Sequence, residues 1–193
     1  PHETPPFSEI KLSDYEPAFD AAIACSRAEV EAIVKNPKKP TFGNTIVALE
    51  RQGALLDRIS GVFYNLLEAA TSDQMQEIAL RVQPKLTELS NDVSLNPELF
   101  ARVKAVYEKP GRGLSKEDRK LLEDTYQSFA RNGAALSDAD KELYRKYTSE
   151  LSAATLQFGQ NALAVEQSAE LERRIAALIT TGEEDASFTE SYD

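Results

Sequence analysis

Hydrophobic residues recur at intervals of three and four along almost the whole chain, the spacing of one face of an α-helix. The first three stripes are Tyr15, Phe19, Ile23, Ser26, Val30 and Ile33; Ile46, Leu49, Gly53, Leu56, Ser60, Phe63, Leu67 and Ala70; and Met75, Ile78, Val82, Leu86, Leu89 and Val93. The next three are Leu99, Val103 and Val106; Leu122, Thr125, Phe129 and Ala130; and Leu143, Tyr147, Leu151, Ala154, Phe158 and Ala162. No segment alternates apolar and polar residues long enough for a strand. The pattern predicts an all-α bundle of about six to seven amphipathic helices.

Short polar side chains, which cap helix N-termini, precede four of the predicted helices. They are Ser13, Asn96, Ser115 and Ser137. Ser13 is followed three residues later by Glu16, which is the spacing of a capping box. Breaks between helices are expected at residues 36–40 and 109–113, because both segments contain proline.

Two glycines interrupt the second stripe. Gly53 and Gly61 should each cost about 1 kcal/mol relative to alanine inside a helix. With Ser60 beside Gly61, the small side chains predict a close crossing of another helix backbone; a local kink is the alternative.

The acidic charge is concentrated near one end of the sequence. The 193 residues have a net charge of −10, and residues 165–193 hold eight acids and two bases. The basic residues form no concentrated patch, which disfavours a nucleic-acid partner. Even the longest apolar runs, such as residues 21–25, are too short to span a membrane. From Thr180 onward, five acids without a base predict a flexible acidic tail.

The counts of histidine and cysteine limit the chemistry of the chain. His2 is the only histidine, so neither a His-Glu-x-x-His zinc motif nor a serine or cysteine nucleophile with an internal histidine base can be assembled. We therefore predict no catalytic, cofactor-binding or metal-binding residue. Cys25, the only cysteine, is expected to be a small apolar residue near a buried stripe. A single thiol leaves both a cytoplasmic and a periplasmic location open.

Long segments of the chain resemble a known family of enzymes. Residues 40–79, PTFGNTIVALERQGALLDRISGVFYNLLEAATSDQMQEIA, resemble the N-terminal region of bacterial peptidyl-dipeptidases of the thimet oligopeptidase and oligopeptidase A group. Residues 5–19, 121–137 and 151–164 are similar to successive landmarks of the same region. The resemblance covers about 160 residues in the expected order.

The resemblance implies a mostly helical zinc metallopeptidase of several hundred residues with a deep channel between two halves. The zinc of such enzymes is held by both histidines of a His-Glu-x-x-His motif and a distant glutamate, none of which matches a residue of this chain. Residues 1–164 are thus expected to form a helical N-terminal domain that lacks the zinc site. Residues 165–193 depart from the family and are expected to form a further helix and the acidic tail.

Two functions remain open at this point. In the first, the domain forms one wall of the substrate channel of a peptide-cleaving enzyme and is inactive without the remainder of that enzyme. In the second, it is a stand-alone helical module that binds a peptide or protein without enzymatic activity. Either reading leaves apolar surface through which the chain could self-associate.

Overall fold

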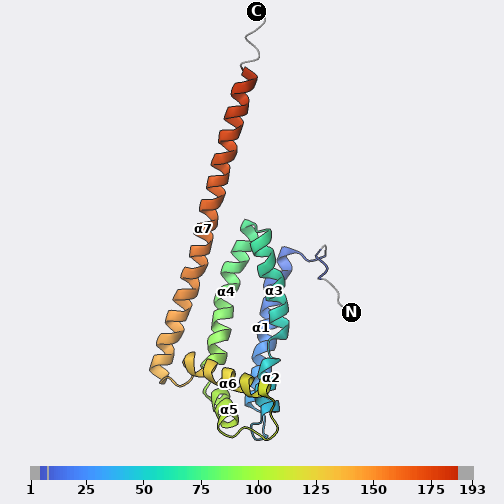
Figure 1. The fold of residues 1–193 in the computed structure, drawn as a ribbon, viewed down its shortest axis with the longest axis vertical. Coiled ribbons are helices and arrows are strands. Elements are labelled where there is room, and N and C mark those ends of the chain that lie inside the picture. Colours follow the sequence, from blue (N-terminus) through green and yellow to red (C-terminus); the bar gives the residue numbers. More distant parts are fainter. Residues whose placement is uncertain (1–4, 8, 187–193) are drawn as a thin grey trace, which may run out of the picture. The chain divides into compact units, whose positions relative to one another are not determined.

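The computed structural model describes residues 5–7 and 9–186, and all regular structure in these ranges is helical (Figure 1). The prediction of an all-α fold is confirmed. The elements are α1 (Leu12–Val34), the π-helix η1 (Phe42–Ile46), α2 (Val47–Glu50), α3 (Ala54–Ala69), α4 (Asp73–Ser94), α5 (Pro97–Glu108), α6 (Lys116–Arg131) and α7 (Asp138–Ala186). The chain divides into two compact units, Pro1–Ser152 and Ala153–Asp193. The predicted boundary after Ala164 stays a prediction.

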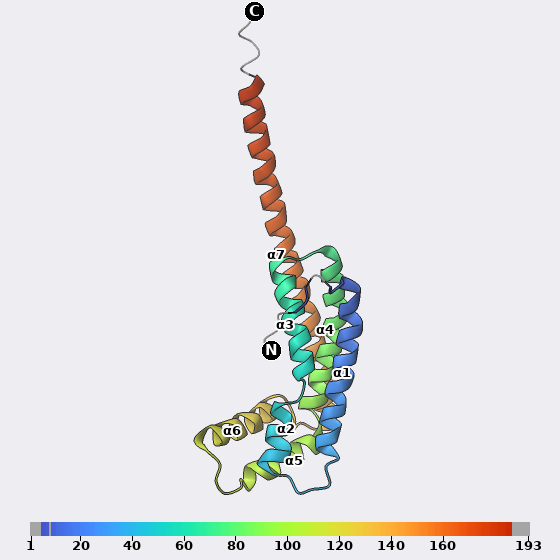
Figure 2. The ribbon, with the colours of Figure 1, turned by 90° about the vertical axis from the view of Figure 1, so that its right-hand side faces the viewer.

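The first unit is built around α1, which packs against both α3 and α4 (Figure 2). Phe19 of α1, Phe63 of α3 and Val82 of α4 are fully buried where the three helices meet. The ring centre of Phe63 lies 5.0 Å from that of Tyr15 and 5.4 Å from that of Phe19. Burial of these apolar stripes is therefore what holds the three helices together.

A second apolar cluster joins the far end of α1 to α5, α6 and η1. Leu99, Val103 and Val106 form the buried face of α5. Arg102, on the same helix, fixes the loop that precedes η1: its guanidinium donates to the backbone oxygens of Asn36 at 2.9 Å and Lys38 at 3.4 Å. The Pro-containing break predicted at residues 36–40 is thereby confirmed.

Three of the four predicted helix caps are confirmed. The side chains of Asn96, Ser115 and Ser137 accept backbone N–H groups of the following first turns. Ser13 is wrong as a cap because α1 begins one residue earlier; the Lys11 N–H donates to the Asp14 carboxylate at 2.9 Å instead. The first turn of α1 is therefore capped by Asp14 and not by the predicted pair of Ser13 and Glu16.

The close crossing predicted at the two glycines is wrong, and at Gly53 the structure shows the alternative, a local interruption of the helix. Gly53 does not lie inside a helix but adopts φ +80° at the start of α3, a left-handed conformation that favours glycine. Its N–H donates to the Glu29 carboxylate of α1 at 2.8 Å. Gly61 is exposed, and apart from its own helix backbone no atom lies within 4 Å of the position that a Cβ would take. Among the described residues, no helix therefore crosses closely at Gly61.

The last helix is longer than the periodicity indicates. We expected a helix up to about residue 164 and a separate one afterwards, but α7 is continuous from Asp138 to Ala186. The segment contains no proline, so nothing in its covalent structure enforces a break. Residues 180–186, predicted to belong to a flexible tail, are helical, while the rest of that tail, 187–193, lies outside the described residues.

Candidate functional site

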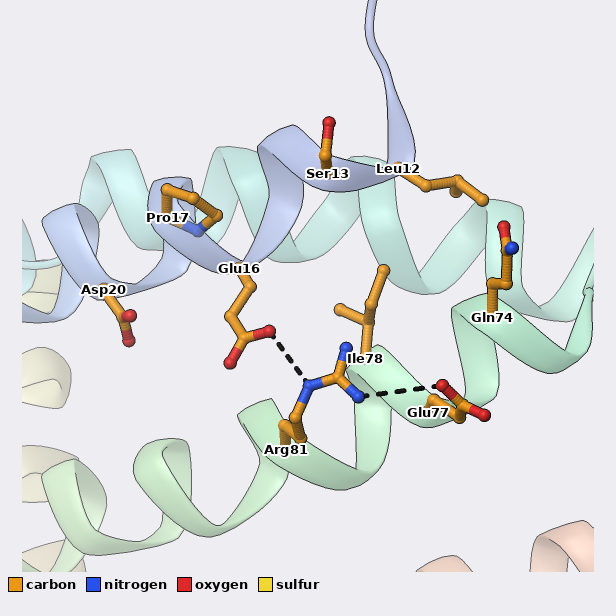
Figure 3. Close-up of a pocket in the computed structure, with 9 residues that line it drawn as sticks. All are labelled: Leu12, Ser13, Glu16, Pro17, Asp20, Gln74, Glu77, Ile78 and Arg81. Atoms are coloured by element: carbon orange, nitrogen blue, oxygen red, sulfur yellow. Dashed lines mark hydrogen bonds and ion pairs between the residues drawn. The ribbon is translucent and has the colours of Figure 1, made fainter.

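A groove in the first unit lies between the N-terminal turns of α1 and α4 (Figure 3). It has a volume of about 720 Å³ and is lined by Leu12, Ser13, Glu16, Pro17, Asp20, Gln74, Glu77, Ile78 and Arg81. Arg81 crosses the groove: its Nε donates to Glu16 at 2.9 Å, and its guanidinium lies 3.8 Å from Glu77.

The remaining carboxylate of this groove, that of Asp20, is also paired with a cation. Lys85 of α4 lies 2.6 Å from Asp20 and 3.6 Å from Glu16. Hydrogen bonding to Asp20 is the main reason why the pKa of Lys85 is raised above its usual range. Because the acids of α1 face the bases of α4, the groove is a charged clasp between two helices. Each of these carboxylates is held in an ion pair, so none is a free general acid or base for hydrolysis.

The first turns of α7 contact α4 through polar side chains. Asn91 of α4 is buried, and its amide nitrogen donates to the hydroxyl of Thr148 at 2.9 Å. One turn away, the Thr87 hydroxyl lies 2.8 Å from that of Ser152. Arg145 of α7 forms an ion pair at 2.8 Å with Asp92. Hydrogen bonds and an ion pair, not apolar packing, therefore position this part of α7.

The apolar face of the same turns is exposed. Leu143, Tyr147 and Leu151 retain 49%, 59% and 67% of their accessible surface. An apolar stripe at helical spacing usually faces the core, but this one does not. Periodicity identifies an apolar face but does not say which neighbour covers it. Here α4 contacts the other side of α7, through Asn91, Thr87 and Asp92.

The structure describes one of the two residues singled out for reactive chemistry, Cys25. Cys25 lies next to the buried Ser26, as expected of a residue near a buried stripe, but is itself exposed, with its sulfur 3.7 Å from Glu29. Position 25 follows the buried Ile23 by only two residues and so falls on the solvent side of α1. His2 lies outside the described residues.

The described residues also offer no place for the zinc ion that the resemblance implies. Within 5–7 and 9–186, no group of three or more histidine, cysteine, aspartate or glutamate side chains is placed to hold a metal. The side chains present here thus do not fit a zinc centre. In the same ranges, no helix is both long and apolar enough to cross a membrane.

Comparison with known proteins identifies the relatives of this chain. It is 41% identical over 169 residues to the dipeptidyl carboxypeptidase of Escherichia coli strain K12, an alignment that covers 87% of this chain and 25% of that enzyme. The chain is homologous to a segment of these peptidases. The dipeptidyl carboxypeptidase of Salmonella typhimurium is 40% identical over 165 residues, and the oligopeptidase A of Haemophilus influenzae is 27% identical over 160 residues. No family model matches the sequence.

The alignments cover most of this chain but only a small part of each relative. The chain spans about a quarter of the length of the curated peptidases that it matches. The resemblance inferred from residues 5–164 is confirmed, since the alignments cover 82–87% of the chain.

Proposed function

We propose that this chain is the N-terminal helical part of a zinc metallopeptidase related to dipeptidyl carboxypeptidase, and that it contributes one wall of the channel that receives the peptide. The observation that carries this proposal is the asymmetry of the alignment with the Escherichia coli enzyme, which covers 87% of the chain and 25% of the relative. A homologous segment of that size corresponds to a structural part of the enzyme.

The side chains of the described residues indicate which part of the enzyme would hold the zinc ion. In an enzyme of this class, the zinc ion activates water and polarises the peptide carbonyl. The described residues offer no cluster of metal-binding side chains, so we assign the zinc ligands to the remaining three quarters of the enzyme. The helices described above serve as scaffold and substrate-facing surface.

A groove lined by neutral polar groups and apolar side chains, with Asp57 as its one charged residue, supports the assignment of a peptide-facing surface. It has a volume of about 400 Å³ and is lined by Ser26, Gln52, Gly53, Leu56, Asp57, Leu86, Leu89, Ser90, Val93, Ser94, Ser128, Phe129 and Asn132. Hydroxyl and amide groups beside apolar side chains suit the amide groups of a peptide whatever its sequence. Within the groove, the Gln52 amide donates to the Ser26 hydroxyl, a bond that a peptide could replace.

A segment exchange tests the proposal. The 169 aligned residues of the Escherichia coli dipeptidyl carboxypeptidase are replaced by the corresponding residues of this chain. We expect the exchanged enzyme to release dipeptides from the carboxyl end of a short peptide in a reaction that a chelator abolishes and added zinc restores. The matched control is the same enzyme with the segment deleted, which should be inactive because one wall is missing.

Two results would contradict the proposal. The first is an exchanged enzyme that folds, as judged by circular dichroism and a cooperative melt, yet is no more active than the deletion control. The second is chelator-sensitive peptide cleavage by the 193-residue chain alone, which would place the reaction within these helices.

The exposed apolar residues of α7 favour a second candidate, a stand-alone binding module. Leu143, Tyr147 and Leu151 would then receive a partner helix without any enzyme. Full activity of the exchanged enzyme would favour the peptidase; a folded but inactive exchanged enzyme, together with tight binding of the isolated chain to an amphipathic helix, would favour the module.

A further inference from the structure

Four aromatic rings form a ladder between α5 and α6, two helices that pack against each other (Figure 2). The rings come alternately from the two helices, in the order Phe129, Phe100, Tyr126 and Tyr107. Successive ring centres are 6.2, 5.8 and 4.0 Å apart, and successive ring planes are inclined by 16°, 20° and 5°. The rings of Tyr126 and Tyr107 are thus the closest and most nearly parallel pair of the ladder.

The ladder leads from the apolar interior to solvent. Phe129 is buried at one end, whereas Tyr107 at the other end is 38% exposed. Neither the Tyr107 hydroxyl nor the Tyr126 hydroxyl is hydrogen-bonded to another of the residues that the structure describes. The two rings that carry a phenol group therefore stand at the solvent end. The two inner rings, which have no phenolic hydrogen to lose, separate them from the core.

Contact between two tyrosine rings is confined to this pair in the part of the chain that the structure describes. Tyr15 and Tyr64 pack against Phe63 instead. Tyr147 is more exposed than Tyr107, at 59%, but no aromatic ring of the described residues stacks on it. Exposure and ring contact are therefore separated in this chain, so that the chemical consequence of each can be measured.

We propose that Tyr107 and Tyr126 form a site of oxidative cross-linking, at which a one-electron oxidant of the haem peroxidase class, supplied with hydrogen peroxide, joins the two rings as dityrosine. Each phenol loses one electron and one proton, and the unpaired electron of each phenoxyl radical spreads to the ring carbons ortho to the oxygen. It occupies orbitals perpendicular to the ring. Rings stacked face to face at 4.0 Å, which is van der Waals separation, therefore point these orbitals at each other.

The atoms and electrons of this step balance. One carbon–carbon bond forms between an ortho carbon of each ring, and the hydrogen on each of these carbons then moves to the phenolic oxygen, which restores both aromatic rings. The two electrons and two protons taken from the phenols reduce one molecule of hydrogen peroxide to two molecules of water. The product carries one new covalent bond between α5 and α6, which closes the loop of residues 109–115.

Treatment of the 193-residue chain with a haem peroxidase and a limiting amount of hydrogen peroxide tests the site. After proteolysis, mass spectrometry identifies the cross-linked peptides, whose summed mass is lower by two hydrogen atoms. We expect the product that joins Tyr107 to Tyr126 to be at least about tenfold more abundant than the product of any other pair of tyrosines, because groups held in contact react faster than groups that must first meet.

Two variants separate ring contact from exposure. Tyr107→Phe keeps an aromatic ring in the stack but has no phenol, so the cross-link should disappear while a circular dichroism melt shows that the fold is kept. Tyr147→Phe removes the more exposed tyrosine and should leave the yield unchanged. Urea that unfolds the chain should remove the preference for this pair, because the stack depends on the packing of α5 against α6.

Four results would overturn the proposal. Equal yields for several tyrosine pairs, or no cross-link at all, would show that the stack does not direct the reaction. A preference that persists in urea would not depend on the fold, and a yield that rises with protein concentration would identify coupling between two molecules. None of these measurements involves peptide cleavage, so the outcome for the cross-link is independent of the outcome for the proposed function.

Discussion

The hydrogen bonds between Asn91 and Thr148 allow a direct test of how α7 is attached to α4. Asn91 is 5% exposed; its amide nitrogen lies 2.9 Å from the Thr148 hydroxyl, and its amide oxygen lies 3.2 Å from the same hydroxyl. Replacing Thr148→Val keeps the shape of the side chain but removes this partner. The amide group of Asn91 is then buried without a hydrogen bond on that side.

The expected cost follows from that unsatisfied group. A buried polar group without its partner destabilises a protein by about 1–3 kcal/mol, so the free energy of unfolding of Thr148→Val should fall by that amount. The double variant Asn91→Leu with Thr148→Val removes both polar groups and should be more stable than the sum of the two single changes predicts, by about 1 kcal/mol. If the contact between α4 and α7 were incidental, the two changes would be additive.

Urea denaturation followed by circular dichroism measures these differences, with the slope of each transition compared so that a change in cooperativity is recognised. Ser149→Val is the control, because Ser149 is the exposed neighbour on the same helix and should change stability by less than about 0.5 kcal/mol. A Thr148→Val variant as stable as the wild type would refute the reasoning, since Asn91 would not depend on α7 for its hydrogen bonds.

Three further predictions concern the first unit. Phe63→Ala should lower the free energy of unfolding by about 3–5 kcal/mol, measured by urea denaturation, because Phe63 is fully buried among aromatic rings. Asn96→Ala should cost about 0.5–2 kcal/mol in the same assay because the two N–H groups that it caps lose their acceptor. Burial raises the pKa of Tyr15 and of Tyr64, so the unfolded chain releases these protons first and stability should fall as the pH rises above about 10. Replacing both with phenylalanine should flatten that decline in thermal melts recorded from pH 8 to 11; an unchanged decline would show that other groups cause it.

Much of the candidate site could not have been predicted from composition or spacing. The charged clasp of Glu16 and Asp20 with Arg81 and Lys85 joins residues that are about 65 positions apart, and no local pattern relates them. The resemblance to peptidases was available from the sequence because it depends on the order of residues in long segments. The side of each helix that stays exposed was not, because it depends on the packing of residues far apart in the sequence.

What the sequence determined by itself is the local structure. Apolar spacing specified helices because a helix repeats every 3.6 residues, and Asn96 and Ser115 specified helix starts because their side chains satisfy nearby N–H groups. The tertiary structure decided what each helix face meets. Cys25 is exposed, and Tyr147 faces away from α4, because burial depends on which neighbour lies opposite, and that neighbour is distant in the sequence.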